Sequence, residues 1–349
     1  MKKRTIHHIL VIRLSAMGDV AISVPVLTAF CTQYPSVKLT LLTKKIYADM
    51  FAHLPNCELI FADLKGEHKG FLGLWKLFKR LQSLSIDAVA DIHNVLRTQV
   101  LKLFFKAIGI PFYQIDKGRA EKKALTRAKN KIFKQLRPTY LRYADVFARM
   151  GFPIAMQKVY FAAKPTLSVS VEKQIDLSKK RIGFAPFAAH VGKQYPFISM
   201  KQVIELIAKN PKYDVFIFGG GEKEKKQAQE LSHLPNVHNT IGKLSFSEEL
   251  QLIARLEVMV AMDSGNAHLS AMYGIPTITL WGVTHIFAGF YPYNQPLEYA
   301  LLSDRDKYPL LPTSVYGNKY PEGYDKAMET IAVESVVNLI NKVIEKGGN

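Results

Sequence analysis

Several features that would assign a protein to a familiar class are scarce or missing in this sequence of 349 residues. It contains only two cysteines, Cys31 and Cys57, which are too few for a disulfide framework or a zinc site and are typical of a reducing cytoplasm. No apolar run approaches the roughly 18 residues that a membrane-spanning helix requires. The N-terminus is basic, but Arg13 and Asp19 interrupt the apolar stretch that a signal peptide would need. The sequence therefore predicts a cytoplasmic protein.

Two common phosphate-binding patterns are also missing. The sequence contains no G-x-x-x-x-G-K-[ST] segment, and the loop after its first expected strand lacks G-x-G-x-x-G. These absences argue against a P-loop nucleotide site and against a dinucleotide cofactor. Because no carboxylate pair demands a divalent ion, we expect neither a metal nor a cofactor.

The sequence does contain enough apolar residues for two cores. Hydrophobic residues make up 48% of the chain, and its length favours two domains. Its positive charge is distributed unevenly, since residues 1–150 hold 26 Lys/Arg against 10 Asp/Glu, whereas residues 151–349 hold 21 against 19. This imbalance predicts that the N-terminal half meets a polyanion, such as nucleic acid, an anionic membrane or a phosphorylated substrate.

Short apolar runs alternate with helical patterns along the chain, which predicts parallel, doubly wound sheets. In the first half we expect strands over 8–12, 37–42, 58–61 and 86–91. We expect helices over 20–34, 44–51 and 71–84, and a further helix after 93–97 that ends at about residue 107. In the second half we expect strands over 181–185, 214–218, 258–262 and 276–280, and a final helix over 326–345.

One stretch, 258–282, combines a strand, a turn, a helix and a second strand. Asp263, Ser264 and Gly265 follow the apolar run 258–262, and small or apolar side chains then continue towards Gly274. A helix that starts at the carboxyl end of a parallel strand presents free N–H groups and a positive dipole end, which suits a phosphate. An ordinary capped helix shows the same pattern, so these residues alone leave both interpretations open.

Four motifs together resemble the ADP-heptose–lipopolysaccharide heptosyltransferase family, glycosyltransferase family 9. They occur in the family's order over nearly the whole chain: Arg13-Leu14-Ser15-Ala16-Met17-Gly18-Asp19, Lys193-Gln194-Tyr195-Pro196, Gly219-Gly220-Gly221-Glu222, and Asp263-Ser264-Gly265 with His268. The resemblance implies a GT-B fold, an α/β architecture in which two Rossmann-like domains with doubly wound parallel sheets face each other across a cleft. Tyr195 departs from the family's usual Trp, and Ala188 and Ala189 stand where many members carry hydroxyl residues.

The resemblance also implies roles for individual residues. Asp19 is implied as the catalytic base, although a carboxylate there could simply cap the following helix. The residues implied in donor binding are Lys193, Glu222, Asp263, Ser264, Gly265 and His268. Two of these have plain structural alternatives, because a glycine-rich loop before a helix is common and His268 could fill the packing between helix and sheet.

Candidates for acceptor binding follow the first and fourth expected strands: Ser15, Gly18, His93, Asn94 and Arg97. A basic run over 117–142, with ten Lys/Arg and one acid, adds Lys122, Lys123 and Arg127. With its interleaved apolar residues it forms a basic amphipathic stretch, which suits phosphorylated headgroups or an anionic membrane surface, but a solvated helix face is also commonly basic. No aromatic-rich strand pattern or GXXG loop supports nucleic acid as the partner.

These expectations combine into an inverting, metal-independent transferase of heptose from ADP-heptose to the lipopolysaccharide inner core, in peripheral contact with the cytoplasmic face of the inner membrane. We expect an acceptor-binding domain over 1–165, a nucleotide-sugar domain over 166–325, and a helix within 326–349 that packs back towards the first domain. Two alternatives stay open: a GT-B transferase of another nucleotide sugar, and a non-catalytic basic protein that binds RNA or anionic lipid.

Overall fold

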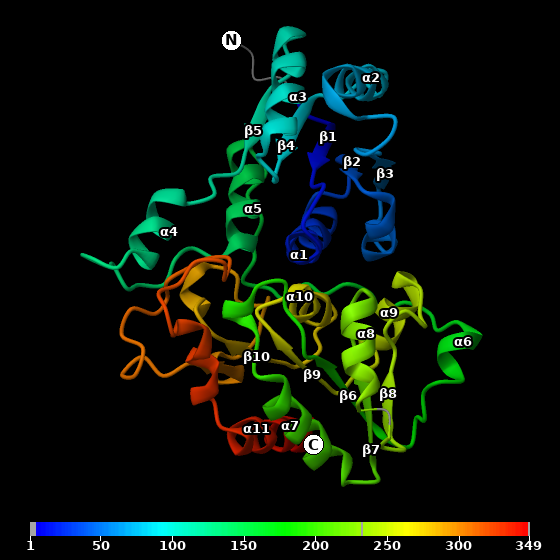
Figure 1. The fold of residues 1–349 in the computed structure, drawn as a ribbon. Coiled ribbons are helices and arrows are strands. Elements are labelled where there is room, and N and C mark those ends of the chain that lie inside the picture. Colours follow the sequence, from blue (N-terminus) through cyan, green and yellow to red (C-terminus); the bar gives the residue numbers. More distant parts are fainter. Residues whose placement is uncertain (1–4, 232, 348–349) are drawn as a thin grey trace. The chain divides into compact units, whose positions relative to one another are not determined.

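A computed structural model describes residues 5–231 and 233–347 and shows two compact units, each built around its own parallel sheet (Figure 1). The first unit comprises Met1–Lys117 and Thr139–Ala162, and the second comprises Gly118–Pro138 and Ala163–Asn349, within the described residues. Residues 1–4 of the expected first domain and 348–349 of the expected C-terminal helix lie outside the described residues. The two parallel sheets confirm the predicted fold class.

The first sheet has the strand order β3-β2-β1-β4-β5, and every pairing is parallel. Its strands are β1 (His8–Ile12), β2 (Lys38–Thr43), β3 (Cys57–Phe61), β4 (Ala88–Asp91) and β5 (Phe112–Gln114). Ile12 is in register with Leu42 on one side and with Asp91 on the other, so the loops that follow β1 and β4 leave the same edge of the sheet.

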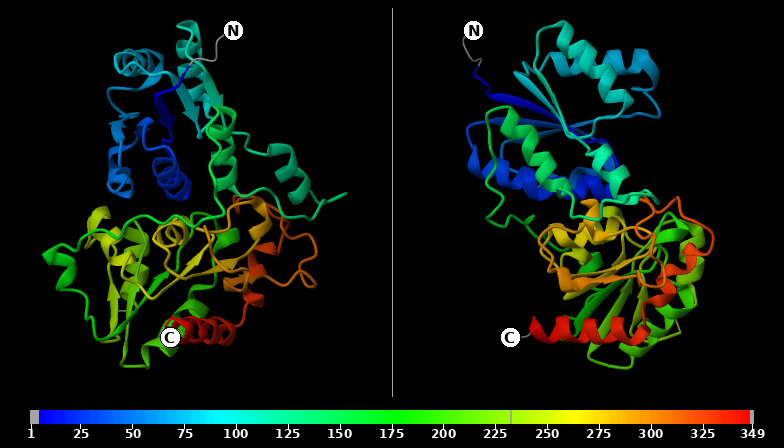
Figure 2. Two further views of the ribbon diagram at one scale, coloured as in Figure 1. Left: turned by 180° about the vertical axis from the view of Figure 1, so that it is seen from behind. Right: turned by 90° about the vertical axis from the view of Figure 1, so that its left-hand side faces the viewer.

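Helices cover both faces of the first sheet (Figure 2). They are α1 (Met17–Gln33), the 3-10 helix η1 (Lys45–Phe51), α2 (Gly70–Gln82), α3 (Leu96–Ala107) and α5 (Thr139–Arg149). α1 packs with α5 on one face, where the Phe30 and Phe147 rings lie 4.8 Å apart, and α2 packs with α3 on the other. The segment 44–51 was predicted as a helix and forms the tighter 3-10 type, and the three-residue β5 was not predicted.

The second sheet has the order β11-β10-β9-β6-β7-β8, again with parallel pairings. Its strands are β6 (Lys180–Ala185), β7 (Tyr213–Ile217), β8 (Val237–Asn239), β9 (Val258–Met262), β10 (Thr277–Trp281) and β11 (Ala300–Leu302). Its helices are α4 (Arg119–Thr126), α6 (Val169–Glu172), α7 (Phe197–Ala208), α8 (Glu222–Gln229), α9 (Phe246–Ile253), α10 (Gly265–Met272) and α11 (Val333–Lys346), with 3-10 turns η2 (Val191–Lys193), η3 (Ile286–Ala288), η4 (Leu297–Tyr299) and η5 (Tyr324–Thr330).

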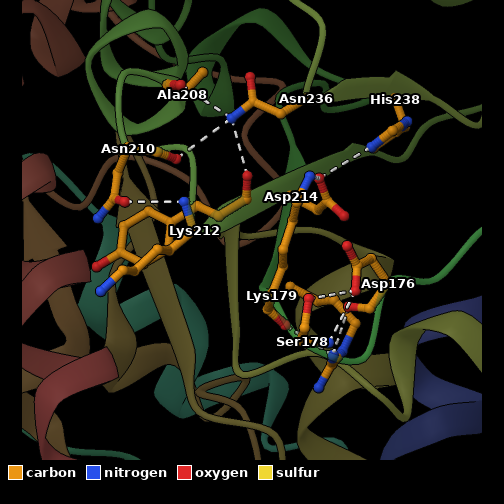
Figure 3. Close-up of polar contacts among 11 residues, drawn as sticks. Asp176, Ser178, Lys179, Ala208, Asn210, Lys212, Asp214, Asn236 and His238 are labelled. Carbon is orange, nitrogen blue, oxygen red and sulfur yellow. Dashed lines mark hydrogen bonds and ion pairs between the residues drawn. The ribbon is translucent and has the colours of Figure 1, made fainter.

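The amino ends of β6, β7 and β8 are joined by polar contacts of side chains (Figure 3). The buried Asp214 carboxylate accepts a hydrogen bond of 3.1 Å from Lys179 Nζ, and Asn236 Nδ2 donates to the carbonyls of Ala208 and Tyr213 at 2.9 Å each. These contacts fix the end of the second sheet that lies away from its carboxyl edge.

The basic segment 118–138 belongs to the second unit, whereas we expected it in the first domain. The buried side chains of Leu125 and Leu136 form a small core with Ala288, and the Leu136 N–H donates to the Phe287 carbonyl at 3.0 Å. Lys131 Nζ donates to the Pro312 carbonyl at 2.6 Å. The chain therefore enters the second unit at 118, returns to the first unit at 139, and enters the second unit again at 163.

This placement removes most of the charge imbalance that the sequence suggested. Grouped by compact unit, the first unit holds 19 Lys/Arg against 9 Asp/Glu, and the second holds 28 against 20. The net charges are +10 and +8. The excess of charge before residue 150 was real, but the fold distributes it between both units, so net charge does not distinguish them.

The C-terminal helix also differs from its prediction. It begins at Val333, after the 3-10 turn η5, and its buried side chains Val336, Ile340 and Val343 join the core of the second unit. α11 packs against α7 of the same unit, and its apolar face contributes to the covering of the second sheet. Within residues 5–231 and 233–347, no helix is long and apolar enough to cross a membrane.

Candidate active site

Each sheet reverses its strand order at one place, and the candidate residues follow the strands that border it. In the first sheet the reversal lies between β1 and β4, and in the second it lies between β6 and β9. Ligands of open α/β sheets bind outside the carboxyl ends of the strands at such a reversal. The loop of Asp19 follows β1, and the loop of His93 follows β4. Lys193 and Asp263 follow β6 and β9 in the same way.

Asp19 lies in the first turn of α1 and pairs with Arg13, with 2.7 Å between Asp19 Oδ2 and Arg13 Nη2. The Arg13 side chain is buried and its Nη1 donates to the Ile92 carbonyl at 2.7 Å, which links the ends of β1 and β4. The Asp19 side chain stays 29% exposed. A buried arginine thus orients a carboxylate that is still partly exposed.

Tyr143 of α5 contacts both Arg13 and Asp19. Its buried ring lies 5.6 Å from the Arg13 guanidinium carbon, and its hydroxyl donates to the Asp19 backbone carbonyl at 3.3 Å. Burial raises the pKa of Tyr143, so its hydroxyl remains a donor at neutral pH. Tyr143 therefore positions the start of α1, a role that the sequence did not suggest.

His93 and Asn94 lie next to this pair after β4. Asp91 Oδ1 accepts hydrogen bonds from the backbone N–H groups of His93, at 3.0 Å, and of Asn94, at 2.9 Å. The His93 Nε2 lies 3.4 Å from the Ser15 hydroxyl, which brings together two of the predicted acceptor residues. Arg97 is exposed on the first turn of α3, and Gly18 lies in the first turn of α1.

Burial, and after it the positive charges of Arg13, Lys117, Arg97 and Lys44, lower the pKa of His93 to about 3. The imidazole is therefore neutral at physiological pH and acts as a neutral donor or acceptor of hydrogen bonds.

We expect acidification to destabilise the protein through His93. Between its ordinary pKa of 6.5 and about 3, the unfolded state binds a proton that the folded state does not, so the free energy of unfolding falls with falling pH. The upper limit of the loss at pH 5 is about 2 kcal/mol. His93→Gln should reduce the difference in unfolding free energy between pH 7 and pH 5, as measured by urea denaturation. His190→Gln, at an exposed histidine, is the matched control, and equal pH dependence of all three proteins would contradict this prediction.

Lys193 and Asp263 form the centre of the second site. Lys193 Nζ lies 2.7 Å from Asp263 Oδ2 and donates to the Asp263 carbonyl at 3.2 Å. Both side chains are largely buried. An ammonium group has three donors, so these two contacts leave one donor for a further acceptor such as a phosphate oxygen.

Glycines let three loops approach closely around Lys193. A Cβ at Gly282 would lie 2.3 Å from the Gly192 carbonyl oxygen, which accepts a hydrogen bond from the Val283 N–H at 2.8 Å. Gly317 has a φ of +80°, and a Cβ there would lie 2.5 Å from Lys193 Cγ. These positions require glycine and hold the lysine stem in one place.

The turn 263–265 joins β9 to α10. Ser264 is the N-cap of α10, but its hydroxyl makes no capping bond. Among the described residues, its buried Oγ has no hydrogen-bond partner. A buried polar atom without a partner is costly, and it lies beside the first-turn N–H groups of the helix that begins at Gly265. His268 is buried one turn further on.

The glycine loop after β7 differs in detail from its prediction. Glu222 begins α8 with its side chain 80% exposed, and its Oε1 lies 3.9 Å from Lys225 Nζ. Glu224 is the residue that shapes the loop, because its Oε2 accepts a hydrogen bond from the Gly220 N–H at 2.7 Å. The pattern gly-gly-gly-acid predicted the loop, but it did not show which carboxylate turns back onto it.

The three cations proposed from the basic run all lie in the second unit. Lys122 Nζ lies 4.2 Å from the centre of the Phe290 ring, and Arg127 Nε donates to the Asn130 carbonyl at 2.7 Å. Lys123 and Arg127 are exposed. The structure thus separates these residues from the unit that carries Asp19, His93 and Asn94.

The family model described as glycosyltransferase family 9 (heptosyltransferase) matches residues 74–313. The chain belongs to glycosyltransferase family 9. The lipopolysaccharide core heptosyltransferase OpsX of Haemophilus influenzae is 25% identical over 301 residues, which cover 85% of this chain and 82% of that protein.

Solved structures of family 9 share the fold. A family 9 glycosyltransferase from Veillonella parvula aligns with a TM-score of 0.74 at 18% identity, over 97% of this chain and 98% of its own. The Escherichia coli heptosyltransferase WaaC, solved with ADP-2-deoxy-2-fluoro heptose, aligns with a TM-score of 0.65 at 17% identity, over 96% and 99%. The GT-B fold implied by the four motifs is thereby confirmed, and the protein is a family 9 glycosyltransferase.

Proposed function

We propose that this family 9 enzyme transfers a heptose from ADP-heptose to the inner core of lipopolysaccharide, with inversion at the sugar carbon. The observation that carries the proposal is the cluster of Lys193, the buried Ser264 hydroxyl and the first turn of α10 at the strand reversal of the second sheet. Relatives described as lipopolysaccharide heptosyltransferases, and the WaaC structure with a fluorinated ADP-heptose, support ADP-heptose as the donor.

The donor diphosphate suits this cluster for electrostatic reasons. The remaining donor of Lys193 and the N–H groups of Gly265 and Asn266 would bind its oxygens, and the Ser264 hydroxyl would gain the partner that it lacks. Asp263 holds the ammonium group in place, and His268 supports the same turn. Glu222, exposed beside the glycine loop, is proposed to meet the nucleoside.

Asp19 is proposed as the general base on the acceptor. Its carboxylate would accept the proton of the acceptor hydroxyl as the hydroxyl oxygen attacks the anomeric carbon, and the bond to the diphosphate would break on the opposite face. Inversion follows from this single displacement. Ser15, Gly18, His93, Asn94 and Arg97 would hold the acceptor, with neutral His93 and cationic Arg97 suited to hydroxyl and phosphate groups.

The leaving ADP gains negative charge as the bond breaks. Lys193 and the helix N-terminus would stabilise that charge without a divalent ion. A thermal-shift assay tests the donor assignment: stabilisation by ADP and ADP-heptose supports it, whereas salt-sensitive binding of RNA without a response to ADP would favour the non-catalytic alternative. Turnover of ADP-heptose with defined core acceptors tests the reaction, and a chelator should leave that turnover unchanged.

The basic residues Lys122, Lys123 and Arg127 are proposed to act on an anionic acceptor at a distance. The triple replacement by Gln should raise the apparent KM for a phosphorylated acceptor, and added salt should have the same effect because the Debye length is about 8 Å at physiological ionic strength. The KM for ADP-heptose should stay unchanged. The KM for both substrates, measured at low and high salt, checks this. Since the segment belongs to the second unit, a rise in the donor KM instead would reassign these residues to the donor.

We also propose that the enzyme works in the cytoplasm in peripheral contact with the anionic surface of the inner membrane, where a lipid-linked acceptor would be found.

A further inference from the structure

The first unit exposes a group of large apolar side chains on α2 and α3. Phe71 is 63% exposed, Leu72 80% and Trp75 46% on α2, and Leu103 is 67% exposed on α3. The rings of Phe71 and Trp75 lie 5.4 Å and 5.0 Å from the ring of Phe104 on α3, so the two helices share one surface. We call Phe71, Leu72, Trp75, Leu103 and Phe104 the aromatic patch.

α2 is packed against the first unit even though these side chains are exposed. The opposite face of the helix is fully used, since Leu74, Leu77 and Phe78 are buried against the first sheet. Large apolar residues are thus present on both faces, and Phe71 and Leu72 on the outer face stay mostly exposed. Contiguous exposed apolar patches of this kind mark interaction surfaces.

Exposed cations lie on the same two helices as the aromatic patch. Lys69, Lys76, Lys79, Arg80 and Lys106 are exposed on α2, α3 and the residue before α2. Lys79 Nζ lies 6.0 Å from the centre of the Trp75 ring. Neither helix contains an acidic residue, and the nearest acid in the sequence, Glu67, is paired with Lys76 at 2.7 Å.

We propose that the aromatic patch is the surface by which this protein docks on an anionic lipid bilayer. Trp and Phe are favoured at the level of lipid headgroups, and Lys and Arg beside them attract anionic lipids. A second copy of the chain is a poor occupant, because the exposed cations of two such surfaces repel each other. This charge complementarity selects an anionic surface.

The patch also lies on the helix that starts at the candidate acceptor residues. α3 begins two residues after Asn94, and Leu96 at its first position and Leu103 lie seven residues apart on one face. At 1.5 Å per residue, that separation is about 10 Å along the helix. A membrane-bound patch would therefore keep the start of α3, two residues after Asn94, within about this distance of the lipid headgroups. The proposal that the protein docks on a bilayer depends only on the aromatic patch and the charges near it. The proposal that docking serves a lipid-linked acceptor rests on the proposed function.

The chain contains its own reporter for this proposal. It has two tryptophans, of which Trp281 is buried in β10 and Trp75 lies in the patch. Vesicles of phosphatidylcholine with 30% phosphatidylglycerol (about that anionic fraction is enough to attract a polybasic surface) should shift the Trp75 emission to the blue, and Trp75→Phe should abolish the shift. Pure phosphatidylcholine vesicles should bind at least about tenfold more weakly. No shift with anionic vesicles, or equal binding to both, would overturn the proposal.

Two double variants test whether the vesicles bind at the aromatic patch. Phe71→Ser with Leu72→Ser keeps Trp75 as the reporter, and should reduce sedimentation with anionic vesicles at least about tenfold. Leu177→Ser with Leu297→Ser removes two comparably exposed side chains from the second unit and should leave binding unchanged. Equal losses in both variants, or none in the first, would contradict the assignment, as would dimerisation of the wild type that the first variant abolishes. The assay contains neither donor nor acceptor, so its failure leaves the transfer reaction untouched, and turnover of a soluble acceptor should be equal in both variants.

Discussion

Asp19→Asn should lower the turnover of heptose transfer roughly a hundredfold or more and leave ADP binding nearly unchanged. An amide cannot accept the proton of the acceptor hydroxyl, but its oxygen can still accept the hydrogen bond that Arg13 now donates to the carboxylate. The substitution therefore removes the base and keeps the start of α1 in place. Steady-state turnover with ADP-heptose, together with calorimetric titration of ADP, measures both quantities.

Asp49→Asn provides the matched control for this experiment. Asp49 is an exposed carboxylate of the first unit, on η1, and its replacement changes the net charge by the same amount. Near wild-type turnover of Asp19→Asn would remove Asp19 from the mechanism. Loss of turnover together with a lowered melting temperature would show instead that the pair with Arg13 is mainly structural.

The second large effect concerns Lys193. Lys193→Ala should weaken ADP binding by about 1.5–3 kcal/mol, or roughly tenfold to more than a hundredfold, because it removes a charge-assisted hydrogen bond to the diphosphate. The change also leaves the buried Asp263 carboxylate without its cation, so part of the loss will appear as reduced stability. Adenosine, which has no phosphate, should bind the variant and the wild type equally well.

Lys209→Ala, at an exposed lysine at the end of α7, is the control for the loss of one positive charge. Calorimetry with ADP and with adenosine separates the phosphate contact from a general disturbance of the site. Equal affinity of Lys193→Ala and the wild type for ADP would place Lys193 outside the donor site. An equal loss for adenosine would indicate a collapsed loop.

The sequence predicted the sheets well because parallel strands buried on both faces read as continuous apolar runs, such as 258–262 and 8–12. It also predicted that Asp19 and Asp263 follow strand ends, because turn residues come directly after those runs. The partners of these residues were harder to predict. Lys193 and Asp263 are seventy positions apart, and only the order of β6 and β9 in the sheet shows that their side chains pair.

One expectation failed because it relied on order along the chain. The basic run was assigned to the first domain because it comes before residue 150, but its apolar residues Leu125 and Leu136 are buried beside Ala288. Hydrophobic spacing shows that a helix has an apolar face and does not show which core receives it. In the same way, the apolar residues over 71–84 predict a helix but do not show that Phe71 and Trp75 are exposed on it.

The excursion of residues 118–138 has a consequence for dissecting this enzyme into fragments. A single cut near residue 165 would remove Leu125 and Leu136 from Phe287 and Ala288, and would leave apolar surface bare on both pieces. Neither piece should be soluble alone, whereas a second-unit fragment that carries 118–138 through a short engineered linker should be. The same logic applies to exchange between relatives: a chimaera with one crossover near 165 would join the two halves of this small core from different parents, so the segment and the 285–290 loop must be inherited together.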